Sequence, residues 1–306
     1  MPSAIEVVGL SKRFGELRAV NDLSFEVPAG RVTGFLGPNG SGKTTTLRML
    51  LGLVSIGDGS ATLGGRRYVD IEEPIRHVGA VLEATSFHPG RRARDHLRLV
   101  ARASGISESQ VDKSLDNVGL SDVANRRVGK FSLGMRQRLQ LAIALLGEPE
   151  VLILDEPSNG LDPQGMQWLR NLIRGQAAIG HAVLISSHLL SEMEETVDDV
   201  VIVSQGTLVL HATLEELGNR ATSTGTRVRT RELPRLIAAL EHTAVAWRQT
   251  GSDTLVIEGA SSDWFGPFAA EHRIVLDEVV HERGSLEDVF LRLTHGYDAI
   301  DPAEHA

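Results

Sequence analysis

The sequence Gly37-Pro38-Asn39-Gly40-Ser41-Gly42-Lys43-Thr44 matches the phosphate-binding loop pattern G-x-x-x-x-G-K-S/T at every fixed position. Its glycines let the backbone curl so that successive N–H groups point at phosphate oxygens. Lys43 supplies a positive charge at the β- and γ-phosphates, and the Thr44 hydroxyl can ligate Mg²⁺. These residues predict a site that binds the phosphates of a nucleotide.

The segments on either side of the loop support this interpretation. Residues 32–36 form a short apolar run that is typical of a buried strand, and residues 45–51 have the pattern of a helix. The alternative is a glycine-rich turn that matches by chance, but such a turn would not need a strand before it and a helix after it. We therefore predict a strand–loop–helix unit whose helix N-terminus faces the anion.

Length and composition limit the classes of protein to consider. A chain of 306 residues with 42% hydrophobic residues is expected to hold one large domain and a smaller one. The net charge of −9 provides no basic footprint, so we do not expect nucleic acid as a partner. The sequence contains no cysteine, which excludes disulfides and thiolate metal sites.

The N-terminus and the apolar runs indicate where the protein works. Residues 1–6 lack the basic and apolar regions of a signal peptide, and no apolar run approaches the roughly 20 residues that span a bilayer. We expect a soluble, cytoplasmic chain.

Two more apolar runs end in polar residues. Residues 151–154 lead into Asp155 and Glu156, and residues 182–185 lead into Ser186-Ser187-His188. Taken singly, each polar residue could be a helix cap or an ordinary loop residue. Open α/β sheets, however, bind ligands at the carboxyl ends of their parallel strands, so the runs and the phosphate loop together predict one site.

An aromatic residue near the N-terminus is a candidate for contact with a base. Strands are expected over residues 5–8 and 23–27, and Phe14 lies in the turn between them. There it could stack on a nucleobase, although a phenylalanine near a glycine more often belongs to the core.

The region between the phosphate loop and Asp155 is largely helical in pattern. Another buried strand is expected over residues 78–82, followed by helices from Arg91 to Gly147 that break at Gly105 and near Gly119. Within them Arg94, Arg98 and Arg102 share i,i+4 spacing, and Arg91 and Arg92 lead into this row. The row is either a contact for a partner or a lipid headgroup, or a solvated helix face.

These residues carry a resemblance to the ATP-binding subunits of ABC transporters, which extends over residues 4–219. Phe14 falls at the adenine-stacking aromatic of that family, and His188 at its switch histidine. The remaining motifs follow in the family's order: Walker A at 37–44, the signature motif at 131–135, Walker B at 152–156 and the D-loop at 159–162.

The resemblance implies a fold, cofactors and site residues. It implies an α/β P-loop NTPase with a RecA-like core, an antiparallel β subdomain and a helical subdomain at about 84–150. ATP and Mg²⁺ are the implied cofactors, with Glu156 orienting the attacking water and His188 contacting the γ-phosphate. By the same resemblance the residues that bind ATP are Phe14, Gly37, Pro38, Asn39, Gly40, Ser41, Gly42, Lys43, Thr44 and Thr45. The resemblance implies that the metal is bound by Thr44, Glu83 and Asp155. It also implies a head-to-tail homodimer, in which the nucleotide of the second subunit is contacted by Ser132, Gly134, Met135 and Asp162.

The sequence also departs from the family pattern. The signature motif, usually L-S-G-G-Q, has Leu133 for its first glycine and Met135 for its glutamine, and Glu83 replaces the Q-loop glutamine. The segment 82–89 resembles the ATPases of ABC-2 type drug and peptide-antibiotic exporters, in which such variants are familiar. We therefore expect an active ATPase.

The resemblance also implies a partner, because this chain is not expected to cross a membrane. We expect a separate integral membrane permease, with this subunit peripheral on the inner face of the cell membrane and a drug, antibiotic or lipid-like cargo. The first alternative is a soluble, non-transport ABC ATPase, although such proteins more often fuse two cassettes or carry basic linkers. The second is a weakly hydrolysing nucleotide sensor, which Glu156 and His188 argue against.

Residues 220–306 lie outside the resemblance and are expected to form an accessory domain. A Thr/Ser/Gly-rich linker occupies residues 221–226. The predicted strands are 227–230, 245–249, 254–258 and 274–280, and the predicted helices are 233–241, 262–271 and 286–294. The first six elements run β-α-β-β-α-β, which suggests a ferredoxin-like domain. It could bind a ligand, but a dimer-stabilising appendage is favoured because fold alone implies no function.

Overall fold

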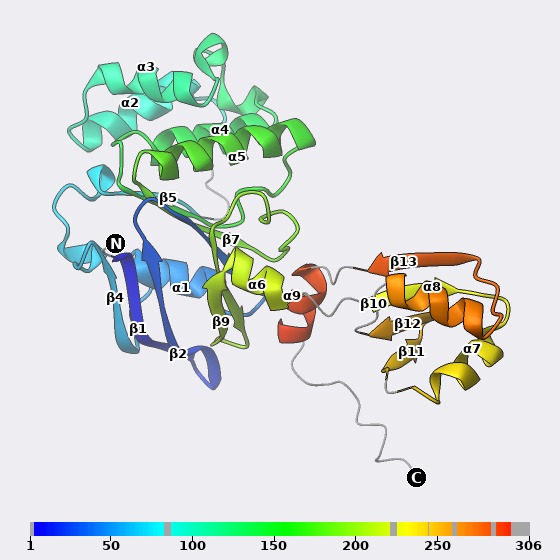
Figure 1. Ribbon diagram of the computed structural model, residues 1–306. Coiled ribbons are helices and arrows are strands. Elements are labelled where there is room, and N and C mark those ends of the chain that lie inside the picture. Colours follow the sequence, from blue (N-terminus) through cyan, green and yellow to red (C-terminus); the bar gives the residue numbers. More distant parts are fainter. Residues whose placement is uncertain are drawn as a thin grey trace. The chain divides into compact units, whose positions relative to one another are not determined.

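The computed structural model describes residues 3–82, 87–220, 225–243, 245–258, 262–282 and 286–294 (Figure 1). The chain divides into two compact units: among the described residues, the larger unit holds those up to Leu214 together with Thr294, and the smaller unit holds those from Glu215 to Leu293.

The larger unit is built on a six-stranded sheet. Its strands lie in the order β5 (Val78–Val81), β6 (Val151–Leu154), β7 (Ala182–Ser187), β3 (Val32–Leu36), β8 (Asp199–Ser204) and β9 (Thr207–Thr213). All neighbouring strands are parallel except β8 and β9. Every residue of β3, β6 and β7 is buried, as continuous apolar runs in a parallel sheet covered on both faces should be.

A second, antiparallel sheet completes the core of this unit. It contains β2 (Leu17–Pro28), β1 (Ser3–Phe14) and β4 (Asp58–Leu63), in that order. Its apolar face packs against the first sheet and helix α1 (Lys43–Leu50), and the rings of Phe25 and Phe35 stack at 5.2 Å between centroids. This sheet is the antiparallel subdomain that the resemblance predicts. Its first two strands are longer than expected, because they continue to the hairpin at Gly15.

Helices gather at one end of the larger unit (Figure 1). They are α2 (Ala93–Ala103), α3 (Glu108–Asn117), α4 (Leu133–Ala144) and α5 (Pro163–Ala178). The predicted breaks are confirmed, because α2 ends just before Gly105 and α3 just before Gly119, and both glycines have positive φ. The Ser132 hydroxyl caps α4 and the Asp162 carboxylate caps α5.

The smaller unit confirms the predicted β-α-β-β-α-β order. Its antiparallel sheet has the order β11 (Trp247–Gln249), β12 (Thr254–Glu258), β10 (Gly225–Arg229), β13 (Glu278–Glu282). Helices α7 (Leu233–Leu240) and α8 (Ser262–Glu271) join these strands, and their apolar side chains pack on Val228, Leu255 and Ile257 of the sheet. Helices α6 (Leu214–Arg220) and α9 (Leu286–Thr294) flank these elements in the sequence.

One predicted strand of the smaller unit begins in the wrong place. The predicted strand starts at Ile274, whereas the observed strand β13 begins at Glu278. Side chains satisfy the backbone of Val275 instead of a neighbouring strand: its N–H donates to Glu232 Oε2 at 3.0 Å, and its C=O accepts from Thr230 Oγ1 at 2.6 Å. Ile274 therefore enters the core from a connecting segment.

Among the residues that the structure describes, none of the helices combines the length and the apolar character that crossing a membrane requires.

Candidate functional site

The phosphate loop joins β3 to α1, as predicted from the pattern on either side of it. Gly42 precedes α1 with a φ of +99°, and a Cβ atom there would lie 2.5 Å from the carbonyl oxygen of Ala19. Glycine is therefore required for both conformation and space. No side chain caps the N-terminus of α1, which leaves the N–H groups of its first turn to an anion.

A pocket of about 810 Å³ opens over this loop. It brings together residues that lie far apart in the sequence, since β1, the loop and α1, the end of β6 and the end of β7 all contribute. The predicted residues that line it are Phe14, Asn39, Gly40, Ser41, Gly42, Lys43, Thr44, Thr45, Asp155, Glu156 and His188. Gly37 and Pro38 do not line it, but their carbonyl oxygens accept hydrogen bonds from Lys43 Nζ at 2.5 and 3.3 Å.

Lys43 is the buried cation of this pocket, with 6% of its side chain exposed. Its Nζ lies 3.7 Å from Glu156 Oε1. Burial lowers the pKa of the Lys43 ammonium below its ordinary value, and the carboxylates of Glu156 and Asp155 oppose this shift. The site thus holds a desolvated positive charge directly beside a carboxylate.

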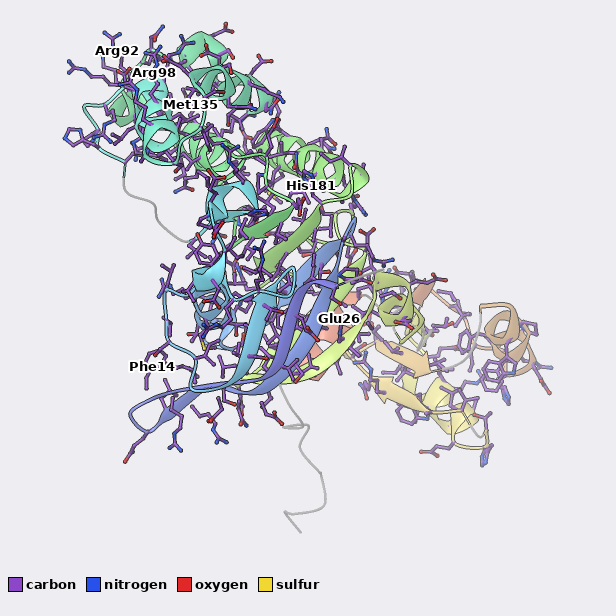
Figure 2. All side chains as sticks on the ribbon, turned by 90° about the vertical axis from the view of Figure 1, so that its left-hand side faces the viewer. Phe14, Glu26, Arg92, Arg98, Met135 and His181 are labelled. Atoms are coloured by element: carbon purple, nitrogen blue, oxygen red, sulfur yellow. The ribbon has the colours of Figure 1, made fainter. Side chains whose placement is uncertain are left out.

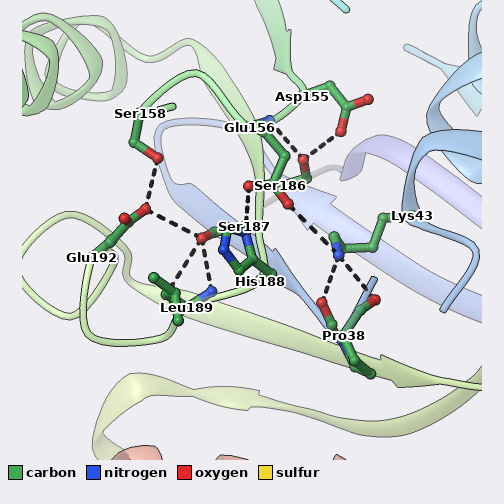
Figure 3. A network of polar contacts seen from close by, with 11 residues as sticks. Pro38, Lys43, Asp155, Glu156, Ser158, Ser186, Ser187, His188, Leu189 and Glu192 are labelled. Atoms are coloured by element: carbon green, nitrogen blue, oxygen red, sulfur yellow. Dashed lines mark hydrogen bonds and ion pairs between the residues drawn. The ribbon is translucent and has the colours of Figure 1, made fainter. Parts of the chain in front are cut away.

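The two carboxylates that follow β6 have different surroundings (Figure 3). Glu156 Oε2 lies 2.9 Å from His188 Nδ1, so this carboxylate stands between a histidine and a lysine. Asp155 is 3% exposed; its Oδ1 accepts a hydrogen bond from Ser186 Oγ at 2.6 Å, and its Oδ2 has no partner among the described residues. Glu156 also has a left-handed backbone, with φ +47°.

Two of the residues predicted to bind Mg²⁺, Thr44 and Asp155, lie in the described part of the chain, and both suit that ion. A buried carboxylate oxygen without a partner, on Asp155, and the Thr44 hydroxyl belong to the same pocket. Within the described ranges no three His, Asp or Glu side chains cluster as a metal cage. One carboxylate and one hydroxyl suit Mg²⁺, which commonly takes one or two carboxylates together with substrate phosphates and water. Glu83 lies outside the described residues, so its predicted role stays a prediction.

The residues predicted to act in trans line a different pocket. Ser132, Gly134, Met135 and Asp162 border a hollow of about 500 Å³ that shares no described lining residue with the phosphate pocket. Figure 2 shows Met135 and Phe14 at opposite ends of the larger unit. One chain therefore does not bring its signature motif to its own phosphate loop.

Two of the three arginines in the α2 row form ion pairs with the next helix. Arg94 Nη2 lies 3.0 Å from Asp112 Oδ1, and Arg98 Nη2 lies 2.6 Å from Glu108 Oε1; both acids belong to α3. Arg102 is exposed. Since two of the three guanidiniums hold α2 to α3, the predicted contact with a partner is not supported for Arg94 and Arg98.

Several polar residues beside the pocket were given no role from the sequence. Ser186 bonds to Asp155, and Ser158 Oγ donates to Glu192 Oε2 at 2.7 Å. Figure 3 shows both contacts beside Glu156 and His188. The position of Ser186 at the end of an apolar run is the available signal in the sequence, but that position does not show which residues the hydroxyl contacts.

Comparisons with known proteins agree on the larger unit. The family model described as "ABC transporter" matches residues 20–159, and a "Domain of unknown function (DUF8746)" matches residues 223–287. The bacitracin transport ATP-binding protein BcrA of Bacillus licheniformis is 42% identical over 223 residues, which cover 72% of this chain and 73% of that protein. The Nod factor export ATP-binding protein I of Burkholderia lata is 35% identical over 310 residues, covering 96% and 98%.

A solved structure shows the same fold. The structure titled "Structure of ATP binding subunit of ABC transporter" has a TM-score of 0.65 and 30% sequence identity, and the match covers 71% of this chain and 93% of that one.

Proposed function

Because this chain belongs to the ATP-binding proteins of the ABC transporter family, we propose that it hydrolyses ATP to drive export through a separate membrane subunit. The family makes it an ABC-type ATPase that binds nucleotide. The observation that carries the proposal is the contact of Glu156 with His188 inside a pocket that the phosphate loop lines. That arrangement suits transfer of a phosphoryl group to water, which requires positioning and charge neutralisation more than covalent chemistry.

We assign the roles of the site residues as follows. Lys43 and the backbone N–H groups of the loop bind the phosphates, and Phe14, which is half exposed at the rim, stacks on the base. Glu156 orients the attacking water, and His188 holds the Glu156 carboxylate at 2.9 Å and reaches the γ-phosphate. Thr44 and Asp155 would hold Mg²⁺, which when bound neutralises charge on the triphosphate.

The separation of the two pockets supports a head-to-tail homodimer. In such a dimer the signature motif and D-loop of one subunit, with Ser132, Gly134 and Asp162, complete the phosphate pocket of the other. Their own pocket lies open on the larger unit, with Leu133 59% exposed at its edge. A single chain then has no complete site, and pairing becomes a condition of turnover.

The relatives support the proposal that this chain drives export through a membrane partner. The two curated relatives named above are a bacitracin transport protein and a Nod factor export protein, and the second matches across the smaller unit as well. We propose a drug, antibiotic or lipid-like cargo, an integral membrane permease as the partner, and a position on the cytoplasmic face of the membrane.

The test is hydrolysis by the purified chain and by two variants. Lys43→Ala should lose nucleotide binding. Glu156→Gln should retain nucleotide binding but lose about 10²- to 10⁴-fold in rate, because a positioned catalytic group is removed. A Glu156→Gln variant within tenfold of wild type would contradict the assignment of the carboxylate. Co-purification of one membrane protein with the chain would separate the exporter from a soluble, non-transport ATPase.

A further inference from the structure

We propose that Ser186 is a positioning residue for hydrolysis, because its buried hydroxyl holds both the Asp155 side chain and the Glu156 backbone. The proposal rests on the roles assigned above to these two acids. Ser186 Oγ donates to Asp155 Oδ1 at 2.6 Å and accepts from the Glu156 N–H at 2.9 Å. One hydroxyl thus contacts both members of the acidic pair (Figure 3).

The sheet register places Ser186 beside these acids. Strands β6 and β7 are parallel neighbours in which Leu154 pairs with Ile185. The next residues in the same register are Asp155 and Ser186, at the carboxyl end where the pocket opens. Ser186 is fully buried, so water cannot take over its hydrogen bonds.

The partners determine how the hydroxyl is oriented. An ionised carboxylate only accepts hydrogen bonds and a backbone N–H only donates them, whereas a hydroxyl has one proton to give and lone pairs to receive. The Ser186 proton must therefore point at Asp155, and a lone pair at Glu156. An alanine at this position could serve neither group.

The two bonds act on features that hydrolysis requires. The bond to Oδ1 fixes the Asp155 carboxylate so that Oδ2, which has no partner among the described residues, is the oxygen left for a ligand. The bond to the Glu156 N–H supports a backbone with φ +47°, a conformation that is unfavourable for residues other than glycine. It thereby directs the Glu156 side chain toward His188.

The neighbouring serine has different contacts, because successive side chains of a strand point to opposite faces. Ser187 Oγ accepts from the Leu189 N–H at 3.0 Å and lies 3.5 Å from Glu192 Oε2. Within the described part of the chain, Ser187 makes no hydrogen bond to Asp155 or to Glu156.

The test compares Ser186→Ala with Ser114→Ala. Ser114 is also buried, and its hydroxyl donates one hydrogen bond to the Ala142 carbonyl, in the helical part of the larger unit. Ser186→Ala should lower kcat and raise the half-saturating free Mg²⁺, each by about 10- to 100-fold, since groups that orient a metal ligand commonly have this effect. Nucleotide binding without Mg²⁺ should not change. Hydrogen exchange at the Glu156 amide should accelerate in Ser186→Ala and stay at the wild-type rate in Ser114→Ala.

Ser186→Thr keeps the hydroxyl, and it should retain most of kcat and the slow exchange of the Glu156 amide. The proposal is overturned if folded Ser186→Ala has wild-type kcat and exchange, or if Ser186→Thr loses both as fully as Ser186→Ala does. Failure of the proposed function would look different: the wild-type chain itself would show no hydrolysis that depends on Lys43 and Glu156.

Discussion

Leu133 replaces a glycine of the family's signature motif, and its side chain covers a glycine of the D-loop. Gly160 has a φ of +76°, and a Cβ atom on it would lie 2.2 Å from Leu133 Cδ2. On the adjacent residue, Leu161 Cδ2 lies 3.5 Å from the position of a Cβ atom on Gly134. The two segments assigned to the trans contact are therefore packed against each other within one chain.

We expect Leu133→Gly to loosen the D-loop, because it removes this packing and adds backbone freedom at the first residue of α4. Amide exchange at residues 160–162 should accelerate and kcat should fall, while nucleotide binding should not change. Leu133→Met, which conserves volume, is the matched control and should resemble wild type. Unchanged exchange in Leu133→Gly would show that the contact has no effect on the D-loop.

Glu83 is another departure from the family pattern, and its prediction rests on charge. A carboxylate in place of the family's glutamine adds a negative oxygen ligand, which a hard cation prefers over a neutral one. Without the metal, the same charge repels the triphosphate. ATPase rate measured against free Mg²⁺ should therefore half-saturate at a higher concentration in Glu83→Gln, with hydrolysis retained. Superimposable curves would remove Glu83 from the metal site.

At the scale of elements, the arginines of α2 fasten it to α3. Replacing Arg94 and Arg98 by Glu removes their attraction to Asp112 and Glu108 and introduces repulsion. We expect amide exchange across residues 93–117 to accelerate by about tenfold, since partly exposed ion pairs of this kind contribute up to about 1 kcal/mol each. Arg102→Glu is the control, because Arg102 makes no ion pair with a described residue. Equal exchange in both variants would mean that the pairs do not hold the helices together.

How far the sequence predicted these elements depended on the strength of each local pattern. The strand–loop–helix unit and the strand that leads to Asp155 carry continuous apolar runs and a full motif, and the structure has them where expected. The start of the last strand of the smaller unit was harder to predict. The segment from Ile274 is apolar like a strand, but the backbone of Val275 hydrogen-bonds to side chains and not to a neighbouring strand.

Strands β8 and β9 were not predicted, although residues 200–203 form an apolar run. The contacts of Ser186 could not be predicted either, since they depend on the pairing of β6 with β7. Pattern along the chain indicates which segments are strands, but not which strand lies beside which.

At the scale of the whole molecule, the distribution of the predicted site over two pockets supports the proposed head-to-tail homodimer. The first pocket is lined by the phosphate loop, Asp155, Glu156 and His188. The second pocket is lined by Ser132, Gly134, Met135 and Asp162. In a head-to-tail dimer with two-fold symmetry, each complete site combines the first pocket of one subunit with the second pocket of its partner.

This arrangement predicts complementation between two inactive variants. Lys43→Ala disables the first pocket, and Ser132→Arg disables the second by placing a bulky cation at the N-terminus of α4. In their heterodimer, one site combines the intact first pocket of Ser132→Arg with the intact second pocket of Lys43→Ala. A 1:1 mixture should recover about a quarter of wild-type activity, because half of the dimers are mixed and each has one complete site of two. Mixing Lys43→Ala with Glu156→Gln should recover nothing, since both changes lie in the first pocket. If the first mixture stays as inactive as the second, the two pockets do not combine across subunits into independently working sites.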